Sequence, residues 1–98
     1  MTGPVDFEPH AERDIAEAAD WYDEQRLGLG DVFLDAVEAA IDRIADTPLA
    51  FPREDGETRR AILRRFPYQV YYQLRADHLL IIAIMHTSRH PDHWRSRS

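Results

Sequence analysis

The sequence predicts an α+β fold in the order β-α-α-β-β-β, with an antiparallel sheet covered on one face by an N-terminal helical hairpin. Three observations predict it. Apolar residues recur at helical spacing in two segments before residue 48, residues 68–75 alternate between two faces, and Leu79 to Met85 is a continuous apolar run. A chain of 98 residues is the size of one domain, so we expect residues 1–98 to form a single unit.

The N-terminal elements follow from their apolar spacing. Residues 5–7 alternate and predict one short strand. Ala11, Ile15 and Tyr22 then lie on one face of a helix. We expect Tyr22 and its neighbour Trp21 to pack into the core, Trp21 alternatively at the joint between helix and sheet.

A second helix follows a tight turn. Residues 28–30 read Gly-Leu-Gly, and glycine is favoured where a helix ends. Asp31 is suited to the positively polarised start of the next helix, whose apolar stripe includes Phe33 and Ile44. Pro48 ends that helix. A short connection of this kind predicts an antiparallel helical hairpin.

The C-terminal half reads as strands. Residues 48–57 contain two prolines and one glycine and predict a loop, and residues 58–66 have β character. Residues 68–75 have the period of a half-buried strand, whereas residues 79–85 are apolar on both faces, as a central strand is. The three-residue turn at 76–78 predicts an antiparallel hairpin.

Charge divides the chain in two. The net charge of −6 argues against a nucleic-acid-binding protein. Residues 1–57 carry 16 acidic and 4 basic side chains, whereas residues 58–98 carry 2 acidic and 8 basic ones. Every basic residue is arginine, the planar cation suited to carboxylate, phosphate and aromatic partners. Coding bias can explain the missing lysines, but it does not explain the asymmetry.

Several classes of protein are excluded or disfavoured. The chain has no cysteine, so it has neither disulfides nor cysteine-based zinc sites. No apolar stretch is long enough to span a membrane, and Asp6 and Glu8 stand where a secretory leader would be basic and apolar. We therefore expect a cytoplasmic protein that uses no metal or other cofactor.

Two arginine pairs, Arg59-Arg60 and Arg64-Arg65, flank the apolar residues 61–63. Two interpretations are open. The charges can protect the edge of a sheet against aggregation, or they can form a cationic lip for a phosphate or an acidic peptide.

On the outer face of the sheet we expect four alternating side chains, those of Gln69, Tyr71, Gln73 and Arg75. An exposed Tyr71 could stack on a base or pack on a protein partner. The alternative is an ordinary polar face.

His86 ends the apolar run and is followed by Arg89, Trp94 and Arg95. An imidazole could move a proton while arginine holds a phosphate. Alternatively, Trp94 docks the C-terminal tail on the helical hairpin and the arginines are solvated. His86, His90 and His93 are not expected to bind a metal, because Pro91 interrupts the helix that would align them.

With these residues in view, the chain resembles the RelE/ParE superfamily of type II toxin–antitoxin toxins, the plasmid-stabilisation type, and it is closer to the ParE-like members. The matching motifs cover nearly the whole chain: Trp21-Tyr22, Gly28-Leu29-Gly30, Arg65-Phe66-Pro67-Tyr68-Gln69-Val70-Tyr71-Tyr72, Ile82-Ala83-Ile84-Met85-His86 and Arg89-His90-Pro91-Asp92-His93-Trp94. The ending His-x-x-Arg-x-Pro-x-x-Trp after a hydrophobic strand is fairly specific.

The resemblance implies a growth-inhibiting toxin that forms a complex with a cognate antitoxin encoded beside it. ParE-like members poison DNA gyrase, the target we expect. RelE-like members are ribosome-dependent mRNA endonucleases that need no metal, which is the alternative. The chain departs from the endonuclease pattern because it lacks lysine, is acidic overall and has Gln69 where many such enzymes place arginine. A toxin fold kept only for a regulatory role is a third possibility.

The resemblance also suggests site residues. In a RelE-like enzyme, His86 would act as acid or base, with Arg65 and Arg89 on the phosphate. In a ParE-like toxin, the residues expected to bind the target are Arg59, Arg60, Arg64, Tyr71, Arg75, Trp94 and Arg95.

Overall fold

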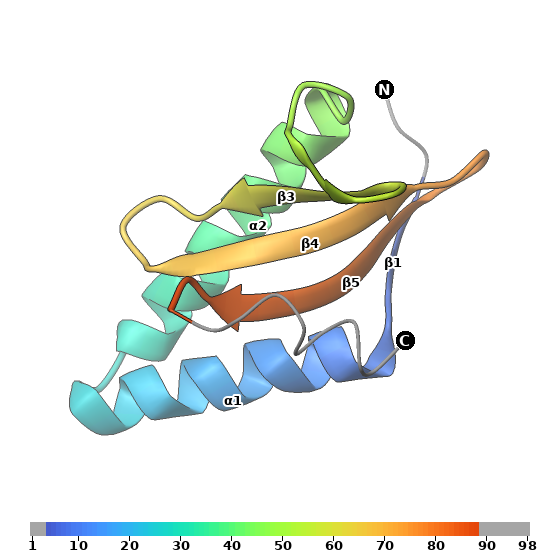
Figure 1. Ribbon diagram of the computed structural model, residues 1–98. Coiled ribbons are helices and arrows are strands. Elements are labelled where there is room, and N and C mark those ends of the chain that lie inside the picture. Colours follow the sequence, from blue (N-terminus) through green and yellow to red (C-terminus); the bar gives the residue numbers. More distant parts are fainter. Residues whose placement is uncertain (1–3, 89–98) are drawn as a thin grey trace.

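The computed structural model describes residues 4–88 and confirms the α+β fold with its helical hairpin (Figure 1). The elements are β1 (Val5–Phe7), α1 (Pro9–Gln25), α2 (Leu29–Asp46), β2 (Arg53–Asp55), β3 (Thr58–Ile62), β4 (Tyr68–Leu74) and β5 (Leu79–His86). The five strands form one sheet in the order β1-β5-β4-β3-β2. In the part of the chain that the structure describes, no helix is long and apolar enough to cross a membrane.

The sheet is mixed, which the sequence did not predict. β1 runs parallel to β5, with Val5 opposite Leu79, while the other neighbours are antiparallel. Alternation assigns a strand's side chains to faces but does not fix the direction of its neighbour. The segment expected to be entirely loop also contains β2, whose three residues are all charged and show no apolar alternation.

The structure has two layers. Both helices cover the same face of the sheet, α1 along β5 and α2 behind β3 and β4 (Figure 1). The core between the layers includes Phe33 and Ile44 from α2 and Val70, Tyr72 and Ile81 from the central strands, all completely shielded from solvent. The predicted helical stripe and strand faces therefore meet, and burial of these apolar side chains stabilises the fold.

The helical hairpin depends on a close approach between α1 and α2. A Cβ atom on Gly30 would lie 2.5 Å from the carbonyl oxygen of Ala19. The amide of Gly30 donates a 2.7 Å hydrogen bond to the Asp23 carboxylate, so α1 supplies the anion at the start of α2. Gly28 has a left-handed φ of 91°, which glycine adopts without strain.

Trp21 and Tyr22 differ in burial. Tyr22 stacks on Phe33 at 5.3 Å between ring centroids and meets Phe66 edge-on at 4.9 Å, as predicted for a core residue. Trp21 is 53% exposed, so the prediction that it packs into the core is wrong. It lies beside the apolar stripe and contacts the edge of Tyr22, which leaves most of the indole in solvent.

Candidate functional site

The outer face of the sheet, opposite the helices, contains a small apolar cluster that the sequence analysis missed. Tyr71 is only 1% exposed and packs with Ala83, Met85 and Ile82, so the prediction of an exposed tyrosine is wrong. A β-bulge lies at this point of the sheet: Tyr71 pairs with Ala83 but Tyr72 pairs with Ile81, which leaves Ile82 as an extra residue on β5. The Tyr71 ring is therefore not available as a base-stacking platform.

Polar groups around this cluster satisfy one another. Arg60 donates from Nε to Glu54 Oε2 at 2.7 Å and from Nη1 to Gln69 Oε1 at 3.5 Å. The Gln73 side-chain amide donates to the Thr58 hydroxyl at 2.9 Å. Glu54 on β2 therefore neutralises Arg60, one of the arginines that the sequence analysis assigned to target binding.

Arg59 points to the other side of β3 and holds the loop that follows α2. Its Nη1 donates to the carbonyl oxygens of Phe51 at 2.7 Å and Leu49 at 3.3 Å. The Tyr72 hydroxyl donates to the carbonyl oxygen of Pro48 at 2.5 Å. Burial raises the pKa of Tyr72 to about 12, although the charge of Arg59 opposes that shift. The Arg59 guanidinium therefore holds the loop after α2 against β3.

Arg64 and Arg65 lie on the β3–β4 turn, and both are exposed. Hydrogen bonds from Leu63 N to the Tyr68 carbonyl oxygen and from Tyr68 N to the Phe66 carbonyl oxygen shape the turn, and Arg65 takes a left-handed φ of 74° in it. Within residues 4–88, neither guanidinium makes a hydrogen bond or an ion pair. No group in this part of the chain therefore occupies these two cations.

His86 lies at the same end of the sheet as this turn. It pairs with Tyr68 across the strands, its ring meets the Tyr68 ring edge-on at 5.2 Å, and Thr87 N donates to the Pro67 carbonyl oxygen at 2.8 Å. Ser88 contacts His86 Nδ1 through its amide at 3.1 Å and its hydroxyl at 2.8 Å. The structure thus brings His86 and the Arg65 turn together. Arg89, Trp94 and Arg95 lie outside the described residues.

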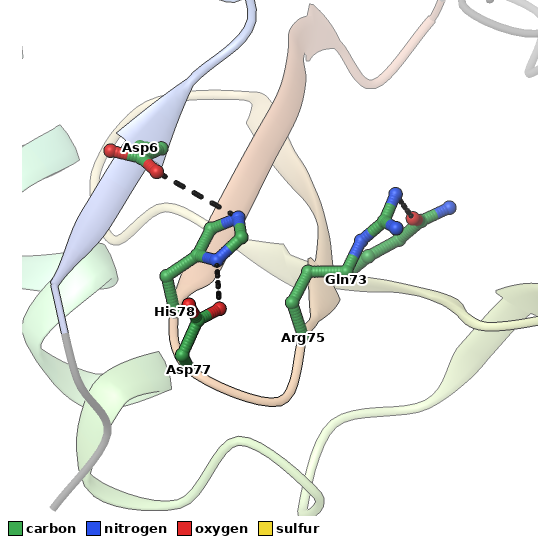
Figure 2. Close-up of polar contacts among 5 residues, drawn as sticks. All are labelled: Asp6, Gln73, Arg75, Asp77 and His78. Atoms are coloured by element: carbon green, nitrogen blue, oxygen red, sulfur yellow. Dashed lines mark hydrogen bonds and ion pairs between the residues drawn. The ribbon is translucent and has the colours of Figure 1, made fainter.

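Arg75 follows the opposite end of β4. It is seven residues, or about 20 Å, from Tyr68, the residue that pairs with His86. Figure 2 shows its guanidinium turned toward Gln73, to which it donates a 2.6 Å hydrogen bond. The nearby His78 ring lies between two carboxylates, with Nδ1 2.7 Å from Asp77 and Nε2 3.7 Å from Asp6. The hydrogen bond from His78 lowers the pKa of the Asp77 carboxyl. Arg75 therefore does not share a site with His86.

The end of the sheet that contains Arg64, Arg65 and His86 is the strongest candidate site, and we call these three residues the turn-end site. It offers one imidazole and two guanidiniums that have no partner among residues 4–88, a set suited to anionic or hydrogen-bond-accepting partners. Residues 4–88 contain no group of three histidine, aspartate or glutamate side chains that could hold a metal.

The layered fold described above is that of the RelE/ParE class of toxins. One similar structure belongs to the chromosomal ParDE toxin–antitoxin system of P. aeruginosa, with 16% identity, a TM-score of 0.65, and 87% of this chain and 96% of that one covered. A mutant of the E. coli toxin RelE in the free state has 15% identity and a TM-score of 0.67, with 98% and 93% covered. The RelBE2 toxin–antitoxin complex of Mycobacterium tuberculosis has 21% identity and a TM-score of 0.60, with 88% and 99% covered.

The chain belongs to the family described as the ParE toxin of the type II toxin–antitoxin system parDE, whose model matches residues 5–91. It is therefore a type II toxin of the ParE/RelE kind. Among curated proteins, no match was found.

Proposed function

We propose that this chain is a ParE-like toxin that inhibits growth by acting on DNA gyrase. The observation that carries the proposal is the chemistry of the outer sheet face. Arg60 on this face is paired with Glu54, and a closed apolar cluster around Tyr71 lies beside it. An enzyme that cleaves RNA on this face would need free cations for the phosphates, because phosphate contacts dominate nucleic-acid affinity. The match to the ParE family supports the same target.

In this proposal, the turn-end site contacts the target protein. Arg64 and Arg65 lie on the turn at the end of the sheet that contains His86. Neither makes a hydrogen bond or an ion pair within residues 4–88. The sequence analysis also assigns Trp94 and Arg95 to target binding, and both lie outside the described residues. Arginine and aromatic residues are enriched at protein interfaces, which supports a protein as the partner of this set.

The proposed antitoxin would neutralise the toxin by packing across the helical hairpin. Trp21 on α1 and Leu34 on α2 are 53% and 40% exposed, and exposed large apolar side chains can anchor a partner. Two of the similar structures come from toxin–antitoxin systems. A disordered antitoxin segment that folds on binding could cover such a surface.

A second candidate, mRNA cleavage on the ribosome, is favoured by one observation. The β3–β4 turn with Arg65 and the end of β5 with His86 are joined by the hydrogen bond from Thr87 N to the Pro67 carbonyl oxygen. His86 would act as acid or base and Arg65, with Arg89, would hold the phosphate. The net charge of −6 opposes this candidate, because RNA repels an acidic protein.

Induction of the chain in cells, with and without the neighbouring open reading frame, tests the two candidates together. Action on gyrase predicts a DNA-damage response and arrested DNA synthesis before translation falls. Cleavage of mRNA predicts early loss of translation and new codon-dependent 5′ ends in primer extension. The proposal is contradicted if translation stops first and such ends appear. Co-expression of the neighbouring frame should restore growth if it encodes the antitoxin.

A further inference from the structure

The hydrogen bonds of His86 specify which ring nitrogen carries the proton. The Ser88 amide lies 3.1 Å from Nδ1, and a backbone N–H can only donate. Nδ1 must therefore offer its lone pair, and the Ser88 hydroxyl, 2.8 Å away, donates to the same atom. In the neutral imidazole the proton then lies on Nε2, because one nitrogen donates while the other accepts.

This tautomer limits what His86 can do. A general base acting through Nε2 needs a lone pair there, and the Nε2–H tautomer has none. A general acid needs the imidazolium, whose Nδ1–H would face the Ser88 N–H and break that hydrogen bond. Within residues 4–88, Nε2 itself makes no hydrogen bond, so its N–H is available to a partner.

We propose that Ser88 is a positioning residue that holds His86 in the Nε2–H tautomer, so that His86 meets the target as a hydrogen-bond donor and not as a proton-transfer group. The cross-strand contact with Tyr68 fixes the ring plane, and Ser88 fixes the ring's protonation. The partner atom is then an acceptor, such as a protein carbonyl or carboxylate oxygen. Only this last identification depends on the proposed action on a protein target.

Nitrogen-15 NMR of the purified chain at a pH where its histidines are neutral measures the tautomer directly. His10, exposed on α1, serves as the internal reference, and a His86→Gln spectrum assigns the signals. We expect the ratio of Nε2–H to Nδ1–H at His86 to exceed that at His10 by about tenfold, the effect of one or two net hydrogen bonds. The amide of Ser88 discriminates between the tautomers because an N–H can only donate, whereas the hydroxyl can donate to Nδ1 or accept from it. Ser88→Pro, which lacks that N–H, should therefore abolish the excess, while Ser88→Ala, which keeps it, should retain most of it. Equal ratios at His86 and His10, or an unchanged ratio in Ser88→Pro, would overturn the proposal.

Growth inhibition by two substitutions of His86 tests the donor role. The side-chain amide nitrogen of glutamine can occupy the region of Nε2, whereas that of the shorter asparagine lies nearer Nδ1. We expect both variants to inhibit growth less than the wild type does. His86→Asn should need at least ten times the inducer concentration that His86→Gln needs to stop growth. Equal loss in both would contradict a donor role and indicate proton transfer. The NMR result does not depend on the target, so failure of the gyrase proposal and failure of this inference can be told apart.

Discussion

Arg59 and Arg65 belong to the same arginine-rich stretch, yet they differ in what their guanidinium groups contact. Arg59 donates to two carbonyl oxygens of the loop after α2, whereas Arg65 makes no such contact within residues 4–88. A guanidinium that donates to backbone carbonyl groups of a neighbouring loop contributes to stability, and one left in solvent is available for binding. The same division separates Arg60, paired with Glu54, from Arg64.

Arg65 allows binding and stability to be separated in one substitution. Its left-handed φ of 74° strains a residue with a Cβ atom, so Arg65→Gly should raise the free energy of unfolding by about 0.5 to 1 kcal/mol after the entropy of glycine is subtracted. It also removes a cation from the turn-end site and should weaken growth inhibition. Urea unfolding and the inducer threshold for arrest measure the two effects. A variant that is both less stable and equally inhibitory would refute this assignment.

Tyr72 makes the fold sensitive to alkali. Its pKa is raised from 10 to about 12 in the folded chain, so its contribution to stability is complete below pH 10 and is lost as the pH rises through 12. Two pKa units correspond to about 2 to 3 kcal/mol. Tyr72→Phe should cost about 1 to 2 kcal/mol at pH 7, because the Pro48 carbonyl loses its donor, and it should flatten the alkaline loss. Urea unfolding between pH 7 and 12 measures both, and an equally steep loss in the variant would disprove the assignment.

At the scale of the elements, the helical hairpin depends on two glycines for different reasons. A Cβ at position 30 would collide with the backbone of Ala19, whereas a Cβ at position 28 would meet nothing within 4 Å. Gly30→Ala should therefore destabilise the chain by about 2 to 4 kcal/mol through overpacking. Gly28→Ala is the matched control and should cost about 1 to 2 kcal/mol, through its left-handed φ alone. Equal losses in urea unfolding would show that the close approach of α1 and α2 does not matter.

The sequence predicted the helices and the two central strands because their periods extend over many residues. It could not predict β2, since all three of its residues are charged, or the direction of β1, since alternation is the same in parallel and antiparallel strands. The bulge at Ile82 could not be predicted either. Residues 79–85 are apolar throughout, so a shift of one residue leaves no trace in the sequence pattern.

The candidate site was predicted in part. The sequence indicated the arginines and His86 but not which arginines would find partners within the fold. Glu54 reaches Arg60, and the carbonyl groups of Leu49 and Phe51 reach Arg59, only through the tertiary structure. The role of Ser88 depends on a local turn that residue type alone does not define. Tyr71 was assigned to the outer face, but the sequence did not show that it packs there with Ala83 and Met85 from the neighbouring strand.

Across the whole molecule, the acidic half forms the helices and the basic half forms most of the sheet. Within residues 58–88, Arg60 is paired with Glu54, while Arg59 and Arg75 donate to neutral oxygen atoms. The turn-end site is a local cationic patch on an acidic protein. Arg64→Gln should therefore weaken growth inhibition severalfold, as loss of an interface arginine does. Arg13→Gln, the same charge change on the exposed surface of α1, is the control and should have little effect. Equal effects of the two substitutions would indicate that net charge, and not this patch, controls inhibition.

The most direct test of the central claim is a supercoiling assay with purified gyrase, relaxed plasmid and the purified chain. The account predicts inhibition of supercoiling, or accumulation of gyrase cleavage complexes, at micromolar concentrations of the chain. It also predicts a weaker effect from a variant that carries both Arg64→Gln and Arg65→Gln. Supercoiling that proceeds unchanged at these concentrations, with no cleavage complexes, would contradict the assignment of gyrase as the target.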